Sequence, residues 1–389
     1  MKRVIKTQPK RFSASSKRAA RAALAAASLA TLVAVASLGG AQARQHGLAV
    51  GAASARQIQP TAAVSADRPL PGRLSETGLY VAGSTSEIAP ENLAYAPQYP
   101  LWSDGATKRR WVSLPKGARI DASNPDDWQF PVGTRFWKEF SFGERTETRY
   151  LERSQDGSFR YATYVWDAAQ RDALLAPSAG LPAIREIQPG VLHDIPSDGD
   201  CRACHEGRRS PVLGFGALQL STDRDPLAPH RELQPSGAID LAELVRRDLL
   251  RGLPASVLAQ PPRIAAPSAS ARASAGYLFA NCAHCHNGSG PLASLGLDFD
   301  QSVGDDRGYE RLRANVVGRA SRYRIPGETH SRRAWPEKPE QSAIWFRMQS
   351  RFAAAQMPPL GTKLVDAEAV RLIQRWISAD LRPSSSPVD

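Results

Sequence analysis

Short apolar and polar stretches alternate along residues 79–167, whereas longer helical patterns follow residue 200. The stretches 135–142, 145–153 and 159–166 are rich in aromatic residues and are predicted to be strands. Gly143-Glu144 and Asp156-Gly157 separate them, and Asp-Gly is a strong hairpin signal. The pattern therefore predicts a three-stranded antiparallel meander inside a β domain that spans residues 79–180.

Apolar residues recur at helical spacing in the second half of the chain. Helices are predicted over 239–249, 276–285 and 366–381, and Asp366 is the expected N-cap of the last one. Residues 253–271 are rich in Pro, Ala and Ser and are predicted to be a linker. The fold class that follows is α+β, an antiparallel β domain followed by an all-α domain.

Residues 1–43 have the pattern of a secretory signal peptide. They contain eight Lys or Arg and no Asp or Glu, then an apolar run over 22–38, then Ala41-Gln-Ala43. We expect cleavage after Ala43 and export to the periplasm, with an uncleaved membrane anchor as the alternative. Residues 44–78 are rich in Ala, Gly, Pro and Gln and are expected to form a flexible lead-in.

The composition of the 389 residues, 42% apolar and 23% charged, is close to the globular average and excludes wholesale disorder. A formal charge of +12 would suggest nucleic-acid binding if it belonged to the folded protein. Cleavage of the signal peptide would remove eight positive charges and leave +4. We therefore expect no nucleic-acid partner, and no membrane contact beyond the possible anchor.

The motif Cys-x-x-Cys-His occurs twice and is the attachment sequence of c-type haem. Two thiols three residues apart on a helical turn bond to the two vinyl groups of one porphyrin, and the adjacent histidine supplies an axial nitrogen to iron. The sequence therefore predicts two covalently attached haem c groups. The attachment residues are Cys201, Cys204, Cys282 and Cys285, which are all the cysteines of the chain, and the iron ligands are His205 and His286.

A zinc site and a redox dithiol are the two alternative uses of these cysteines. Zinc sites of the Cys-x-x-Cys type usually separate their two pairs by about 12–20 residues, whereas the gap here is nearly 80. A redox dithiol explains neither histidine. Export agrees with haem, which is attached to c-type cytochromes outside the cytoplasm. His284, between Cys282 and Cys285, is expected to point away from the ring and not to bind iron.

The second haem has a candidate sixth ligand. Met357-Pro-Pro-Leu-Gly361 follows His286 by 71 residues and precedes the last predicted helix. Residues 272–382 resemble a class I cytochrome c domain in motif, order and length, and the domain is assigned to 272–389. The resemblance implies an N-terminal helix crossing a C-terminal helix and Met357 as the ligand opposite His286. The alternative for Met357 is an ordinary core methionine, the role expected of Met348.

The sixth ligand of the first haem, which belongs to the segment 181–252, stays open at this point. His193 and His230 flank the first motif and are candidates, and an open or water-ligated position is the third possibility. Arg208 and Arg209 lie just beyond the motif and are candidates for pairing with haem propionates, with a solvated basic turn as the alternative.

Together these features resemble a family of exported two-haem c-type cytochromes over about residues 80–380. The matching residues are both haem motifs, Leu101-Trp-Ser-Asp-Gly105, Phe130-Pro-Val-Gly-Thr134, Lys138-Glu-Phe140, Glu147-Thr-Arg-Tyr150, Pro211-Val-Leu-Gly-Phe215 and Met357-Pro-Pro-Leu-Gly361. The β domain is also weakly similar to cytochrome P460 and β-type cytochrome c′. That likeness implies a small sheet that cups a five-coordinate haem, with Lys138 loosely matching a lysine that crosslinks to the porphyrin in the first of these families. A β-sandwich packed beside the haem domain is the alternative.

The expected function is electron transfer from a periplasmic dehydrogenase to a terminal acceptor, with no catalytic residue. The alternative is a haem enzyme that acts on a small molecule such as peroxide at an open first haem, fed by the second. A gas sensor or a carbohydrate-binding module is the third hypothesis. The chain contains no nucleotide-binding, serine-hydrolase or zinc-protease motif.

Overall fold

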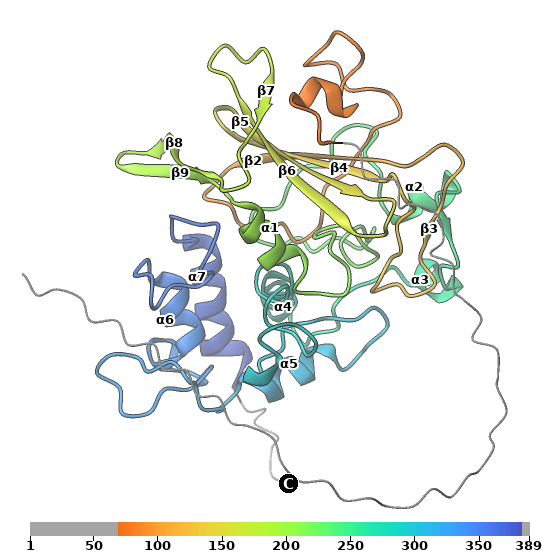
Figure 1. Ribbon diagram of the computed structural model, residues 1–389. Coiled ribbons are helices and arrows are strands. Elements are labelled where there is room, and N and C mark those ends of the chain that lie inside the picture. The colour runs from red at the N-terminus through yellow and green to blue at the C-terminus, as the bar shows by residue number, and fades with distance from the viewer. Residues whose placement is uncertain (1–68, 383–389) are drawn as a thin grey trace, which may run out of the picture. The chain divides into compact units, whose positions relative to one another are not determined.

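The computed structural model describes residues 69–382. The signal peptide predicted over 1–43 and most of the lead-in predicted over 44–78 lie outside the described residues. Within them, an antiparallel β region over about 73–195 is followed by a mostly helical region, so the α+β prediction is confirmed. Figure 1 shows the sheet lying against the helices, with the short helix α1 (Asp198–His205) between them.

The main sheet contains six strands in the order β1-β2-β4-β5-β6-β7, and neighbouring strands are antiparallel. They are β1 (Leu93–Ala94), β2 (Thr107–Ser113), β4 (Arg135–Phe142), β5 (Glu144–Arg153), β6 (Phe159–Trp166) and β7 (Ala173–Leu175). Strands β4, β5 and β6 are the predicted meander, which is confirmed to within a residue. Two smaller pairs are the hairpin of β8 (Leu181–Gln188) and β9 (Val191–Ile195), and the parallel pair of β3 (Ile120–Asp121) and β10 (Leu250–Arg251).

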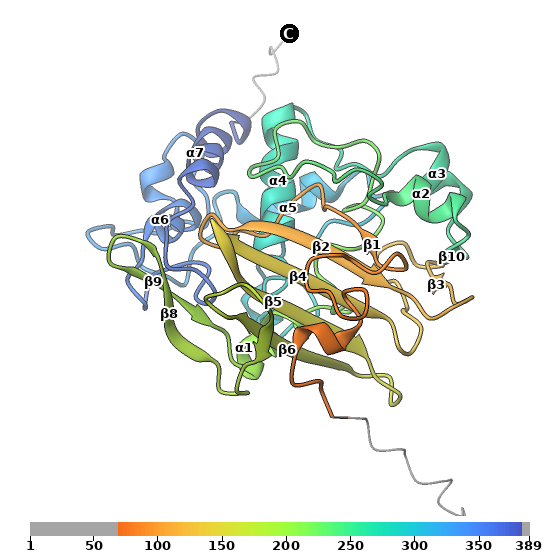
Figure 2. The ribbon, with the colours of Figure 1, turned by 90° about the horizontal axis from the view of Figure 1, so that it is seen from above.

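The two faces of the sheet pack against different parts of the chain, because successive side chains of a strand point to opposite sides. On one face Trp111, Trp137 and Tyr164 form a cluster with Leu74, which lies in the 3-10 helix η1 (Leu74–Thr77). Figure 2 shows this segment crossing the face of the sheet that is turned away from the helices. Leu74 is fully buried, so the packed chain begins ahead of the predicted boundary at residue 79.

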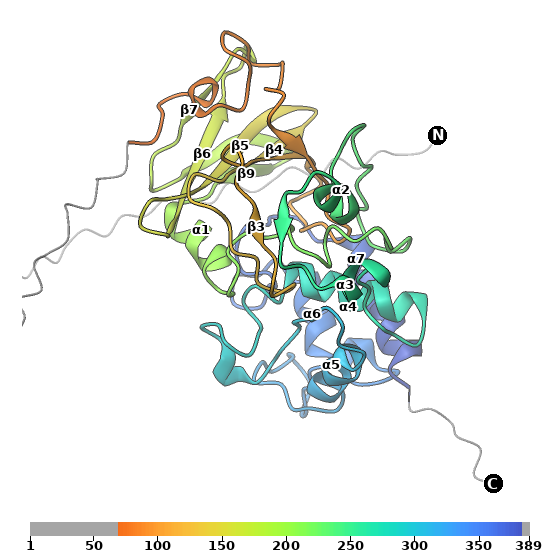
Figure 3. The same cartoon turned by 90° about the vertical axis from the view of Figure 1, so that its right-hand side faces the viewer.

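The other face lies toward the helices (Figure 3). After α1 they are α2 (Leu241–Arg246), α3 (Ala255–Ala259), α4 (Ala269–Asn281), α5 (Gly308–Val316), α6 (Ala343–Gln349) and α7 (Ala367–Arg375), and a π-helical turn η4 (Trp376–Asp380) continues α7. Short 3-10 helices are η2 (Ala293–Leu295) and η3 (Pro339–Gln341). Among the described residues, no helix combines the length and apolar character needed to cross a membrane.

Three helical predictions change in detail. The helix predicted over 239–249 is α2 alone, and the strand β10 follows it. The linker predicted over 253–271 contains α3 and the start of α4. Val257 and Ile264 are buried, so these two apolar side chains hold the Pro-rich segment against the core. The helix predicted over 276–285 begins earlier and ends at Asn281, so the second Cys-x-x-Cys-His motif lies in the turn that follows it.

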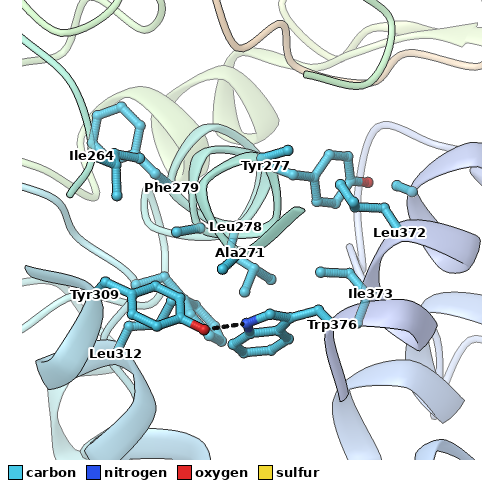
Figure 4. Close-up of a cluster of buried hydrophobic side chains, with 14 of the residues drawn as sticks. Ile264, Ala271, Tyr277, Leu278, Phe279, Tyr309, Leu312, Leu372, Ile373 and Trp376 are labelled. Carbon is cyan, nitrogen blue, oxygen red and sulfur yellow. Dashed lines mark hydrogen bonds between the residues drawn. The ribbon is translucent and has the colours of Figure 1, made fainter. Parts of the chain in front are cut away.

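The core of the helical region forms where α4 meets α7 and η4 (Figure 4). Ala271 and Leu278 of α4 are fully buried, as are Ile373 and Trp376. The indole Nε1 of Trp376 donates a hydrogen bond of 3.1 Å to the Tyr309 hydroxyl on α5. Two other predictions are confirmed here, since the Asp366 carboxylate accepts from the Ala369 backbone N–H as an N-cap and Met348 lies in this cluster.

Trp376→Ala should lower the free energy of unfolding by about 3–5 kcal/mol, because it leaves a cavity and an unpaired Tyr309 hydroxyl in the core. Urea denaturation of the purified protein measures the change. Leu233, which is 89% exposed, provides the control, and Leu233→Ala should stay within about 0.5 kcal/mol of the parent. Equal effects of the two changes would contradict the assignment of this core.

Candidate functional site

The first Cys-x-x-Cys-His motif lies on α1, and a capping box begins this helix. The Ser197 hydroxyl accepts from the Asp200 backbone N–H at 3.1 Å, and the Asp200 carboxylate accepts from the Ser197 backbone N–H at 2.9 Å. Residues three apart are neighbours on a helix surface, so Cys201 and Cys204 share one side of α1. His205 is the last residue of the helix.

His205 is held in the form that binds a metal. Its Nδ1–H donates a 2.6 Å hydrogen bond to the carbonyl oxygen of Pro211, which leaves the Nε2 lone pair available. Burial lowers the pKa of His205 to about 4, so the imidazole is neutral at pH 7. The ring of Tyr161 on β6, 5.3 Å away between centroids, packs against it. In histidines that bind a metal, the other ring nitrogen commonly donates a hydrogen bond to a carbonyl oxygen in this way.

A cavity of about 720 Å³, here called the first cavity, opens beside this motif. Cys201, Cys204 and His205 line it, together with the helix-facing side of the sheet and the segment 351–363. Cavities that hold cofactors and other small molecules measure about 300–1,000 Å³. The first cavity therefore has the size for a porphyrin, and both thiols and the imidazole of the motif border it.

The sheet presents a row of cations to the first cavity. The register places Arg110 on β2 beside Lys138 on β4, and Lys138 beside Arg149 on β5. Arg110 forms an ion pair with Glu232, with a second contact of 3.0 Å, and Arg149 forms one with Glu147 at 2.7 Å. The alternation of a strand puts all three cations on the same face.

Lys138 differs from its two neighbours in this row. Among residues 69–382 its side-chain Nζ has no hydrogen bond or ion pair, and it lies 4.8 Å from the centroid of the Phe140 ring. Burial, together with the charges of the adjacent arginines, holds the pKa of Lys138 well below its ordinary value. A buried amine with a lowered pKa is a proton donor, a nucleophile or a ligand in reach of a bound molecule.

The two candidate distal histidines have different positions. His193 on β9 is buried and lines the first cavity, and its Nε2 lies 3.2 Å from the Glu147 carboxylate. His230 is not among the residues that line this cavity. Its Nε2 lies 2.7 Å from Asp366 and its Nδ1 lies 3.3 Å from Glu368, so both nitrogens are engaged. Of the two, only His193 is positioned near the first motif.

The second motif follows the end of α4. The Asn281 side chain accepts from the Trp102 backbone N–H at 2.7 Å and donates to the Pro100 carbonyl at 3.2 Å, which ties the end of this helix to the segment ahead of β2. His286 is buried, with its ring edge-on to Phe299 at 5.8 Å. Its Nδ1 is buried and has no hydrogen-bond partner among the described residues. Burial lowers the pKa of His286 below its ordinary value.

Met357 follows α6 and contacts Arg347 in the last turn of that helix. Its backbone N–H donates to the Arg347 carbonyl at 3.0 Å, and the charge of Arg347 contributes, after burial, to the lowered pKa of His286. Met357 is only half-buried and belongs to none of the hydrophobic clusters, whereas Met348 is part of one. Iron ligation by Met357 therefore stays a prediction.

All four cysteines are free thiols and half-buried. Burial raises the pKa of Cys201 and Cys204 to about 11 and that of Cys282 to about 12. Within residues 69–382, no three His, Cys, Asp or Glu side chains are arranged to hold a metal ion. The tetrahedral cysteine set that a zinc site needs is thus not formed in this part of the chain.

A second cavity, of about 470 Å³, lies on another side of the motifs. Arg208 and Arg209 line it, and Arg208 forms an ion pair with Asp300 and lies 4.7 Å from the centroid of the Phe279 ring. His284 is 6% exposed and lines both cavities. Arg208 and Arg209 were the expected cations, but Lys138 and Arg149 of the sheet line the first cavity. The alternation of side chains along the predicted strands would have placed both on one face of the sheet.

Comparison of the chain with protein-family models, with curated proteins and with solved structures finds no match.

The buried pair of Glu147 and Arg149 should make stability depend on pH. Burial pushes the pKa of Glu147 upward, but the charge of Arg149 and the hydrogen bonds from Arg149 and His193 outweigh it and hold the pKa below its ordinary value of 4.5. The folded state therefore gains stability above pH 4.5 and loses it as the pH falls through the lowered pKa.

Glu147→Gln should cost about 3–5 kcal/mol of unfolding free energy at pH 7, because it leaves the Arg149 charge unpaired. Urea denaturation at a series of pH values should show this difference shrinking below pH 4.5. Glu206→Gln is the control, since Glu206 pairs with Arg202 on the exposed surface of α1, and its effect should stay under about 1 kcal/mol. A pH-independent difference would contradict the assignment.

Proposed function

We propose that the chain is an exported c-type cytochrome with two haems that transfers electrons between periplasmic redox partners, a dehydrogenase on one side and a terminal acceptor on the other. The observation that carries the proposal is the geometry of His205. Its Nδ1 is tied to Pro211 and its neutral ring borders a cavity of about 720 Å³ that both cysteines of the motif also line.

The residues of the first motif, and the cavity that they line, fit a haem group. Cys201 and Cys204 would hold the first haem through thioether bonds, with His205 as its axial ligand. The residues that would hold the second are Cys282, Cys285, His286 and Met357. When bound, each haem supplies one-electron exchange between ferrous and ferric iron. Burial lowers the pKa of both imidazoles, and the sheet and the segment 351–363 line the first cavity.

Two observations support the finer assignment of domains. Helix α4 packs against α7 immediately before the second motif, as expected of the helix crossing in a class I cytochrome c domain over residues 272–389. The sheet presents one face to the cavity of the first motif, as expected of a β domain that cups a haem. The charged side chains on that face would meet the propionates or a ligand of the first haem.

A second function is favoured by the polar lining of the first cavity. Lys138 has no ion pair among the described residues, and His193 lies beside the Glu147 carboxylate. Groups that hold or accept a proton next to an iron centre are what reduction of a small molecule such as peroxide needs. The alternative is therefore a haem enzyme at the first site, with the second site supplying electrons.

Haem content and carbon monoxide binding test these functions. The pyridine haemochrome assay should give two haem c per chain, and the double variants Cys201→Ala/Cys204→Ala and Cys282→Ala/Cys285→Ala should each retain one. Electron transfer alone predicts that the reduced protein is inert to carbon monoxide, whereas an open first site predicts a rapid change in its spectrum. A chain without haem would overturn both functions.

Met357→Ala should abolish the charge-transfer absorbance from methionine sulfur to ferric iron and lower the midpoint potential of one haem, because a thioether ligand raises that potential. Absorbance spectroscopy and spectroelectrochemical titration measure the two effects. Met348→Leu is the matched control, since Met348 is a buried core residue and the change conserves its volume. Retention of the band in the Met357 variant would remove Met357 from the iron.

A further inference from the structure

The two Cys-x-x-Cys-His motifs, nearly 80 residues apart in the sequence, lie in direct contact. The Sγ of Cys285 in the second motif is 3.9 Å from the carbonyl oxygen of Ala203 in the first. The attachment points for the two haems are therefore neighbours, although the first lies on α1 and the second in the turn after α4.

Gly207 makes this contact possible. It is buried two residues after His205, and a β-carbon on it would overlap the carbonyl oxygen of His284 in the second motif. That oxygen is backbone and cannot move aside as a flexible side chain would, so any other residue at 207 forces the motifs apart. Gly207 is thus required by close approach and not by an unusual backbone angle.

Asn287 fastens the two segments together. Its Nδ2 donates to the Gly207 carbonyl at 2.9 Å and to the Ala283 carbonyl at 2.7 Å, so one amide group bonds to the chain after the first motif and to the second motif itself. The side chain is 2% exposed, and its Oδ1 accepts from the Gly290 backbone N–H at 2.6 Å. Buried hydrogen bonds of this kind fix the relative position of the two motifs.

We propose that the two haem sites exchange electrons directly across the contact formed by Gly207, His284 and Asn287, without a partner protein. The inference rests on the proposed function. A haem held by thioether bonds to these cysteines would lie against its own motif, so contact between the motifs would bring the two haems close together. One electron leaves ferrous iron at one site and reduces ferric iron at the other, and no bond or proton changes place.

The experiment uses the full chain with haem attached. Circular dichroism in the Soret band should show a bisignate couplet that exceeds the sum of the spectra of the two double variants that each retain one haem, because the excess arises from interaction between two haem transitions at short range. After reduction of a small fraction of the haem by a radical pulse, electrons should redistribute between the sites at a rate independent of protein concentration. Gly207→Ala should lose most of the couplet and slow the redistribution while keeping two haems by pyridine haemochrome.

Gly216→Ala is the matched control, because a β-carbon there meets nothing within 4 Å, and it should retain the couplet and the rate. Should the Gly207 variant fail to fold, Asn287→Ala tests the same contact and should weaken the couplet. Two haems without a couplet, or redistribution that speeds up in proportion to protein concentration, would overturn the inference and leave the proposed function standing. Fewer than two haems in the parent protein would overturn the proposed function itself.

Discussion

The close approach of Gly207 to the backbone of His284 is the constraint on which the rest of the arrangement depends. Helix α1 belongs to the sheet, because the Tyr161 ring of β6 packs against its last residue, and the second motif belongs to the helical core through α4. A side chain at 207 would separate the sheet and α1 from the helical core at the point where the two Cys-x-x-Cys-His motifs meet. The bonds from Asn281 to Pro100 and Trp102 tie α4 to the sheet region at a second place, and so fix its direction.

Apolar and charged side chains both line the first cavity, and the strand register places them on the same face of the sheet. On the helix-facing side of β4, Phe136 and Phe140 flank Lys138, so a cation sits between two aromatic side chains. Such an environment disfavours the charged amine unless an anion arrives. The ion pairs of the two neighbouring arginines leave Lys138 as the member of the row best able to respond to a bound anionic group or ligand.

The local features of the fold could be predicted from the sequence. Gly143-Glu144 and Asp156-Gly157 set the ends of β4, β5 and β6, and Asp366 marked the start of α7, because turn chemistry and capping depend on nearby residues. The contact between the motifs could not be predicted, since it joins residues nearly 80 positions apart and Gly207 carries no signal in its own neighbourhood. Helix α4 was expected to run to Cys285, but Asn281 bonds to Pro100 and Trp102 instead, a tertiary interaction that no local pattern contains.

The raised thiol pKa values have a consequence for how the protein matures. Thiols with a pKa of about 11 or 12 are almost wholly protonated at neutral pH, and the protonated form is a poor nucleophile. In the folded chain the four thiols are half-buried, so a group that bonds to them reaches them more easily before the two motifs meet. Under the proposed function, covalent attachment of haem would therefore precede the contact between the two motifs.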